Sequence, residues 1–502
     1  MRTLALVMAA ACTVGPKYEL PSAPVPHGPD YKEAGRVGPW RVASPSDAML
    51  RGAWWKIFHE PELDALEARI DLDNQTVKQA FENFMAARAQ IRAARAQYYP
   101  TVSLAPGVTT GRGGGGSTST FTTGSFSGGS GAAVGFGGGG RFTTYSAPVE
   151  ASWAPDLFGR VRNAVHEAQY NAQVSAADLE NQRLLEQATL AQTYFEIRGQ
   201  DALQELLDQT VVADTQVFEL ARWRFSTGVD TEIAQVQAEQ TLQTARVQAT
   251  NAAVLRAQLE HAVATLIGVP ASSFSLPKRA MLAAPPAIPV GTPSRLLERR
   301  PDIAAAERGM AAANAAVGVA YAAYYPDITL SASAGFASGA ITSLFSWPSR
   351  VWSLGANLAE IVFDGGARGA AVDLAKAQYN AAVASYRQTV LAAFQQVEDQ
   401  LAATSILAVE IEQQHKDVEL AQRAFELEQA RYTSGIDPYI DLMQQQALLL
   451  AARQTMVTLQ IQQMTSAVAL VEALGGGWDK SSLPTPGDIS KSPASSARAM
   501  AH

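Results

Sequence analysis

The side chains best suited to catalysis or metal binding are few in this sequence and lie far apart. It has no Gly-x-Ser-x-Gly elbow and no His-Glu-x-x-His run, the settings in which a nucleophilic serine or a catalytic zinc ion is commonly found. One cysteine, Cys12, excludes a disulfide within the chain and a cysteine-based zinc cluster. No two of the six histidines have metal-ligand spacing; they are His27, His59, His166, His261, His415 and His502. We therefore expect no enzyme, no metal site and no cofactor.

The position of Cys12 suggests a different chemistry. The chain begins with one basic residue, a short apolar run and three alanines (MRTLALVMAAA), and Cys12 follows. A short apolar run that ends in small residues is typical of a secretory signal. A cysteine at that point resembles the acylation site of a bacterial lipoprotein, where the thiol receives a diacylglycerol after cleavage. We expect residues 1–11 to be a signal segment and Cys12 to carry a covalent lipid; the alternative is an inert, small apolar cysteine.

Two short segments place a glycine two residues before an aspartate, Gly228 before Asp230 and Gly435 before Asp437. Glycine adopts the positive φ angle of a tight turn without strain. An aspartate just after such a turn can cap the helix that follows, because its carboxylate accepts hydrogen bonds from free backbone N–H groups. We therefore expect tight turns over 225–230 and 432–437, each leading into a helix.

These two turns belong to a longer internal repeat. Residues 224–230 (RFSTGVD) recur as 431–437 (RYTSGID), and residues 97–104 (QYYPTVSL) recur as 323–330 (AYYPDITL). The chain is therefore a tandem duplication, a pattern that must be recognised before the fold is inferred. The first half is the longer one, and its extra material is a stretch over 111–141 that is nearly all Gly, Ser and Thr. This stretch lacks the Gly-Lys-Ser/Thr ending of a phosphate-binding loop, so we read it as a long loop between strands.

Each half has the predicted order helix, two strands, long helix, tight turn, helix. The strands are indicated by alternation of apolar and polar residues over 101–110, 142–154, 327–337 and 351–363. About ten residues is the length of a tilted strand that crosses a bilayer, although a half-buried sheet in a water-soluble protein has the same pattern. Strand alternation alone leaves both readings open.

The long helices are the stronger signal. Proline is absent from 157–224 and from 370–431, where Ala, Gln, Glu and Leu dominate, and these are good helix formers. At about 1.5 Å per residue, about 65 residues make a rod close to 100 Å long. A rod of this length cannot be buried in a 500-residue globule and needs partner helices along it.

Charge composition argues against a nucleic-acid-binding protein, and the number of strands limits how the chain could enter a membrane. The net charge is -8 and charged residues are 17% of the chain, which argues against nucleic-acid binding. Four strands are too few for a membrane barrel, and an open sheet in lipid would leave unpaired edges. If the strands enter a membrane, several copies must pool them: three copies give twelve strands around a lumen, and two give eight around a packed interior.

Several segments, taken in order, resemble those of the TolC-like outer-membrane efflux proteins, specifically the lipoprotein (NodT-type) branch. They cover nearly the whole chain, from Cys12 to Trp478. The segments are 12–18 (CTVGPKY), 54–63 (WWKIFHEPEL), 156–160 (DLFGR), 296–303 (LLERRPDI), 363–368 (FDGGAR) and 474–478 (LGGGW). Each motif is weak alone, and their common order and spacing make the resemblance specific.

The resemblance implies a mixed α and β membrane protein. Each protomer would contribute four strands to a trimeric 12-stranded outer-membrane β-barrel and long helices to a periplasmic coiled-coil barrel. Such a homotrimer sits in the outer membrane of a Gram-negative bacterium. It is a passive exit duct for drugs and other small molecules that docks a periplasmic adaptor and an inner-membrane pump, expected here to be proton-driven. The alternative is a lipid-anchored periplasmic coiled-coil scaffold or adaptor without a pore.

The resemblance also places the repeated turns at a periplasmic tip that forms the gate and contacts the adaptor. The family's gate usually has an aliphatic residue, an aspartate four positions on and an arginine three beyond, and these positions are Ile440, Gln444 and Ala447. The usual charged ring is thus absent, and we hypothesise a gate closed by Ile440 packing, with Asp437 and Asp441 able to supply acidic rings. The expected site residues are Gly228, Val229, Asp230, Gly435, Ile436, Asp437, Ile440, Asp441 and Gln444.

These expectations divide the chain into six parts. They are a signal segment (1–11), a lipid-anchored extended segment (12–60), the first repeat (61–269), a proline-rich linker (270–294), the second repeat (295–474) and a disordered polar tail (475–502).

Overall fold

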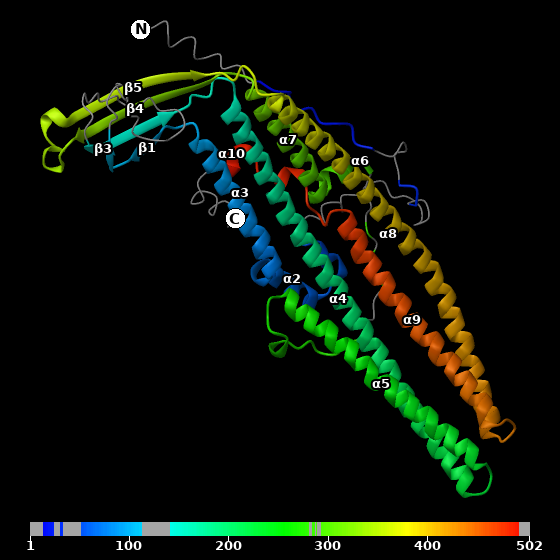
Figure 1. The fold of residues 1–502 in the computed structure, drawn as a ribbon. Helices are drawn as coiled ribbons and strands as arrows, with labels where there is room; N and C mark the ends of the chain where they lie inside the picture. The colour runs from blue at the N-terminus through cyan, green and yellow to red at the C-terminus, as the bar shows by residue number, and fades with distance from the viewer. Residues whose placement is uncertain are drawn as a thin grey trace.

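Four long helices dominate the computed structural model shown in Figure 1, which describes residues 14–24, 31–33, 52–112, 141–280, 284–286, 288 and 293–490. In the first repeat, α4 (Arg160–Ser226) pairs with α5 (Glu232–Leu266); in the second, α8 (Ala367–Thr433) pairs with α9 (Tyr439–Ala473). The two pairs match residue for residue in length, 67 and 35 residues each. Cys12 and most of the Gly-rich loop lie outside the described residues.

The two helix pairs pack closely against each other, α4 against α9, because a small residue lies where these helices meet. Gly199, in the middle of α4, is this residue, since a Cβ there would overlap the Ile461 side chain of α9. The main core lies where both repeats and the α2 region meet, with Leu190, Tyr194 and Ile197 of α4 fully buried. Among the described helices, none combines the length and the apolar character needed to cross a membrane.

Shorter helices pack along the bundle between the sheet and its middle (Figure 1). They are η3 (Trp54–Phe58), α2 (Pro61–Asp73) and α3 (Gln75–Ala96) before the first strands, and α6 (Pro293–Arg299) and α7 (Pro301–Ala322) before the later ones. Asn74 fixes the start of α3, because its side-chain oxygen accepts hydrogen bonds from Thr76 N (2.8 Å) and Val77 N (3.0 Å). Its Nδ2 donates to Leu266 O at the end of α5 (2.8 Å) and so joins the two helices.

One antiparallel sheet extends beyond the end of the bundle (Figure 1). Its strands are β1 (Thr101–Leu104), β2 (Gly107–Arg112), β3 (Arg141–Trp153), β4 (Asp327–Ser338) and β5 (Arg350–Ala359). β1 and β2 both pair with β3, which pairs with β4, and β4 pairs with β5. The single strand predicted over 101–110 is thus broken near Pro106, which has no N–H for the ladder. The strand predicted over 351–363 ends early, at Ala359.

The sheet has two chemically different faces, set by alternation along the strands and by the register between them. On one face Trp352 lies opposite Ala334, and Leu354 opposite Ala332. Large side chains of this apolar face are open to solvent: Trp352 and Leu354 are both 75% exposed. The other face carries mainly small polar residues, including Ser103, Ser146, Ser152, Thr329, Ser331, Ser333, Ser353 and Asn357.

The prediction of a disordered polar tail over 475–502 is wrong for its described part, 475–490. This segment forms η7 (Lys480–Ser482) and α10 (Pro486–Ile489) and lies along α3 and α4. Ile489 is 3% exposed, and its carbonyl accepts a hydrogen bond from Arg88 Nε (3.2 Å). Gln173 Nε2 donates to Pro484 O (3.0 Å). Packing of Ile489, Trp478 and Leu483, together with hydrogen bonds to its backbone, orders a segment whose composition is mostly polar.

Candidate functional site

The repeated turns lie at the end of the bundle farthest from the sheet (Figure 1). Gly228 and Gly435 both have positive φ angles, 75° and 73°. In each turn the residue after the glycine donates its backbone N–H to the arginine carbonyl that begins the motif: Val229 N to Arg224 O and Ile436 N to Arg431 O, at 2.9 and 3.0 Å. The two turns therefore share one backbone design, which only a residue that tolerates the left-handed conformation permits.

The prediction that Asp230 and Asp437 cap the following helices is wrong. The N-cap positions are Thr231 for α5 and Pro438 for α9, and neither makes a side-chain cap bond. Among the described backbone N–H groups, the Asp230 carboxylate accepts only that of the N-cap residue Thr231 itself (2.8 Å), and it lies 3.5 Å from Arg224 Nε, whereas Asp437 forms an ion pair with Arg431. Each aspartate thus lies one residue before the N-cap position and faces a guanidinium on the preceding helix, where its contact is charge-assisted.

Arg224, Asp230 and Tyr432 form a cluster that joins the two repeats, here called the tip cluster. Arg224 Nη1 donates to Tyr432 O (2.8 Å), and the guanidinium carbon lies 4.7 Å from the centre of the Tyr432 ring. Tyr432 Oη also donates to Asp230 Oδ2 (3.4 Å). Arg224 is 9% exposed and Tyr432 1%. Burial, together with the nearby Asp230 carboxylate, raises the pKa of Tyr432 to about 12, so its hydroxyl remains a donor.

The second repeat uses its matching arginine differently. Arg431, which aligns with Arg224, has a side chain 56% exposed and pairs within its own turn with Asp437. Its neighbour Glu428 has a raised pKa, because it is partly desolvated and shares a hydrogen bond with the Asp437 carboxylate, and Asp441 adds to the negative field. Sequence reasoning missed Glu428. The sequence could have indicated it, because Glu428 lies one helical turn before Arg431 and therefore on the same face of the helix.

The remaining expected site residues begin α9. Ile440 and Asp441 are half-buried in the protomer, and Gln444, one turn on, is exposed. Within the turns, Val229 and Ile436 are 63% and 67% exposed. The protomer thus presents two apolar turn residues and an acidic group at one end, with no described partner covering them.

The segment that follows Cys12 is fixed at the opposite end, where sheet and helices meet. Val14 N donates to Phe158 O (3.3 Å), in the link between β3 and α4. Asn163 Nδ2 of α4 donates back to Val14 O (3.0 Å), and Asn314 Nδ2 of α7 donates to Pro16 O (3.1 Å). Both repeats therefore hold the chain two residues beyond Cys12, at the base of the sheet.

Comparison with known proteins decides the family. The family model described as outer membrane efflux protein matches residues 68–269 and 292–476, one match in each repeat. The chain belongs to the outer membrane efflux protein family. The efflux protein is 32% identical over 93% of its length to the probable efflux pump outer membrane protein TtgC of Pseudomonas putida, of which it covers 93%. It is 31% identical to the outer membrane protein OprJ of Pseudomonas aeruginosa, with 94% of each chain covered.

Solved structures agree with this assignment. A membrane protein from Pseudomonas aeruginosa matches 93% of the efflux protein with a TM-score of 0.79 and 28% identity, and 98% of that chain is covered. The MtrE outer membrane channel of Neisseria gonorrhoeae, solved in its open state, matches 93% with a TM-score of 0.75 and 27% identity, and 99% of that chain is covered. The predicted family and tandem-repeat fold class are confirmed, and the efflux protein is an outer-membrane efflux component and not an enzyme.

A second contact between the repeats of the efflux protein lies farther from the tip. Asp214 of α4 is 3% exposed, and Gln446 Nε2 of α9 donates a hydrogen bond to it. Burial raises the pKa of Asp214 to about 6, and the Gln446 hydrogen bond opposes part of that shift. The ionised carboxylate is thus held in the seam between α4 and α9 at a cost in free energy.

We expect replacement of Asp214 with Asn to stabilise the efflux protein at pH 7.5 by about 1–2 kcal/mol. A folded-state pKa above the unfolded value of 3.8 means that the folded state binds the proton more tightly. Stability from this group is therefore present at low pH and is lost as pH rises through about 6. Urea unfolding of the detergent-solubilised protein between pH 4.5 and 7.5 measures the effect. The exposed Asp208, changed to Asn, is the control; equal pH profiles for Asp214→Asn and the parent would contradict this account.

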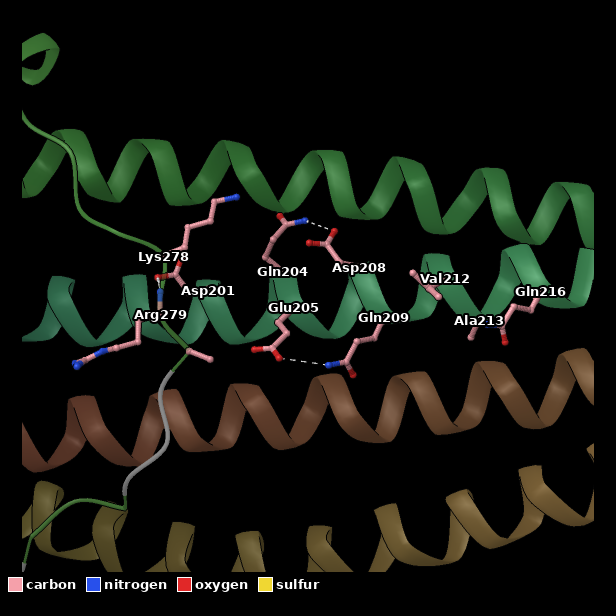
Figure 2. A pocket seen from close by; sticks show the side chains of 11 residues that line it. Asp201, Gln204, Glu205, Asp208, Gln209, Val212, Ala213, Gln216, Lys278 and Arg279 are labelled. Carbon is pink, nitrogen blue, oxygen red and sulfur yellow. Dashed lines mark hydrogen bonds between the residues drawn. The ribbon is translucent and has the colours of Figure 1, made fainter.

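A groove of about 660 Å³, lined mostly by polar and charged residues, runs along α4 beside the linker (Figure 2). At one end, Asp201 binds two buried arginines, Arg198 Nη1 at 3.1 Å and Arg256 Nε at 2.6 Å. The same carboxylate accepts the backbone N–H of Arg279 (2.9 Å), and Arg256 Nη2 donates to Leu276 O (2.7 Å). We call Arg198, Asp201 and Arg256 the linker clamp, because it fastens the segment between the repeats to α4 and α5.

Proposed function

We propose that this efflux protein is the outer-membrane exit duct of a tripartite pump, a homotrimer whose pooled strands close a 12-stranded barrel continuous with a periplasmic tunnel of helices. Small molecules pass through it without energy input of its own. Its partners are a periplasmic adaptor at the helical tip and an inner-membrane pump, expected to be proton-driven. The relatives named as efflux pump outer membrane proteins support the pump context.

The sheet is the observation that carries the proposal. Its outer strands, β1 with β2 at one edge and β5 at the other, each pair on one side only among the described strands of the protomer. Backbone N–H and C=O groups left unpaired in lipid cost several kcal/mol each, so both edges need strands from other copies. The apolar face then meets lipid and the face of small polar residues surrounds water.

Charge placed on the two faces tests the barrel. We expect Leu354→Arg, on the apolar face, to destabilise the assembled protein by about 2–4 kcal/mol and to remove heat-resistant trimers from the outer-membrane fraction. Ser353→Arg, the adjacent residue on the polar face, is the matched control and should assemble normally. Fractionation and unheated gel electrophoresis measure both. Equal loss in the two variants, or a parent protein that salt extracts from the periplasm, favours a lipid-anchored scaffold without a pore.

The proposal includes a covalent lipid on Cys12, and the fixed position of Val14 supports it. A diacylglycerol two residues before Val14 lies within reach of the membrane surface from which the sheet rises. Mass spectrometry of the mature protein should find an N-terminal peptide that begins at Cys12 and carries the lipid mass. Cys12→Ala should leave an uncleaved, unacylated precursor. An unmodified Cys12 in the outer-membrane fraction would contradict the anchor while leaving the duct intact.

The proposal places the gate and the adaptor contact at the tip. The tip cluster joins the two repeats there, and the exposed Val229 and Ile436 provide apolar surface for a docking partner. Gly228 and Gly435 hold these residues at the ends of the turns. Asp230 supports the closed arrangement through Arg224, whereas Asp437, Asp441 and Gln444 face the opening together with Ile440.

A further inference from the structure

We propose that Glu150 sets the charge preference of the duct, because its carboxylate lines the part of the lumen enclosed by strands and favours cations over anions. This inference rests on the proposed function, since only a closed barrel turns the polar face of the sheet into a lumen wall. It assigns selectivity to the barrel as well as to the helical tip.

The register of the sheet places Glu150 on the polar face. It lies opposite Ser103 of β1 and Ser333 of β4, and Ser333 lies opposite Ser353 of β5. Its chain neighbour Val149 points to the other face, where Val149 lies opposite Leu104 and Ala334. Glu150 is thus the one long side chain in a row of serines and projects beyond them into the water-filled side.

Among the described residues, no cation neutralises the carboxylate of Glu150. Within the described strands, the ionisable residues on the polar face are Glu150 and Asp327, and Asp327 is the first residue of β4, at the helical end. Glu150 is exposed, and the described residues offer its carboxylate no ion pair and no hydrogen bond. An unpaired carboxylate this far along a membrane strand is tolerated only where water reaches it.

The dimensions of a closed barrel bring its axis within the field of these carboxylates. Twelve strands about 4.8 Å apart and tilted by about 40° give a backbone radius of about 12 Å. The glutamate side chains reduce the distance to the axis further. Electrostatic screening has a length of about 10 Å at 0.1 M salt and about 3 Å at 1 M. Three copies of Glu150 therefore attract cations, such as protonated amines, across the whole lumen at 0.1 M salt, and hardly at 1 M.

Two measurements test the proposal. In intact cells, a membrane-impermeant thiol reagent should label Glu150→Cys and leave Val149→Cys unlabelled, since the two side chains face opposite sides of the barrel wall. In planar bilayers under a KCl gradient at about 0.1 M, the parent should prefer K⁺ over Cl⁻ by about threefold or more, and Glu150→Gln should lose most of that preference. Glu150→Gln with Ser333→Asp should regain it, because Ser333 is at the same height.

The outcomes separate this inference from the duct itself. Conducting Glu150→Gln channels with the parent's reversal potential would overturn the role of Glu150 and leave the duct standing. A parent preference that persists unchanged at 1 M salt would overturn it as well. A folded outer-membrane trimer that conducts no ions at all would overturn the duct and this inference together.

Discussion

Replacing Arg224 with alanine should open the tip and raise single-channel conductance severalfold. Arg224 donates to Tyr432 O, stacks on the Tyr432 ring and faces the Asp230 carboxylate, so its loss removes the cluster that joins the repeats. Deleting one member of a buried ionic cluster costs about 3–5 kcal/mol, and because the Asp230 side chain is 20% exposed to water, we expect about 2 kcal/mol here. Planar-bilayer recordings measure the conductance, and uptake of a large hydrophilic antibiotic measures opening in cells.

Arg222, two residues earlier on the exposed side of α4, is the matched control for this experiment. Arg222→Ala removes the same charge and should leave conductance unchanged. Arg224→Lys should give an intermediate value, because an ammonium keeps the charge and loses the planar fork that contacts carbonyl and carboxylate together. If Arg224→Ala conducts like the parent, the tip cluster does not hold the channel closed.

The alternative hypothesis, a gate closed by packing of Ile440, can be tested by the same planar-bilayer recordings. Ile440→Ala should raise conductance if Ile440 packing closes the opening, and unchanged conductance would refute that hypothesis. The double variant Arg224→Ala with Ile440→Ala shows whether the tip cluster and Ile440 packing close the channel independently. If they do, the fold increases in conductance of the two single variants multiply in the double variant; if both belong to one closed state, they do not.

Removing the Asp201 carboxylate should be the most damaging change to stability. Asp201→Ala removes the anion that Arg198 and Arg256 share, so each guanidinium keeps one carboxylate partner, Glu62 or Glu260, and the Arg279 N–H loses its acceptor. We expect a loss of about 3–5 kcal/mol. The linker should also detach from α4 and α5. Asp201 orients the two arginines, and both of them donate hydrogen bonds to carbonyl groups of the linker. Urea unfolding and the yield of heat-resistant trimer measure the loss.

Glu205→Ala provides the control, since Glu205 lies one turn along α4 and is exposed. It should change stability by less than about 0.5 kcal/mol. A triple variant with Met, Leu and Met at 198, 201 and 256 should recover much of the stability lost by Asp201→Ala, because an apolar cluster can replace a buried ionic one. An unfolding midpoint for Asp201→Ala equal to that of the parent would contradict the linker clamp.

Local rules predicted the elements well and the contacts between them poorly. Helix α4 follows from a long run of good helix formers, and the positive φ of Gly228 follows from turn chemistry, because both depend on neighbours in sequence. Arg224 and Arg431 occupy the same place in the repeated motif, yet only Arg224 is buried against the other repeat. That difference depends on which helix lies alongside, and nothing within seven residues encodes it.

Long-range polar contacts were missed for the same reason. Asp201 and Arg256 are 55 residues apart and Asp214 and Gln446 are 232 apart, so their pairing appears only once α4 packs against α5 and α9. The ordered part of the tail was missed because a polar composition predicts solvation. In the structure, its backbone carbonyl groups accept hydrogen bonds from the Arg88 and Gln173 side chains.

The fastening of Val14 and Pro16 to both repeats has a consequence for assembly. Asn163 and Asn314 can bind that segment only after α4 and α7 have packed together. A lipid on Cys12 would hold each newly exported chain at a surface before this happens, so the three chains of the proposed trimer would search for one another in two dimensions instead of three. Tethering of this kind raises effective concentration without any new contact. The anchor would then speed trimer formation most when the protein is scarce, and matter little once the strands have closed.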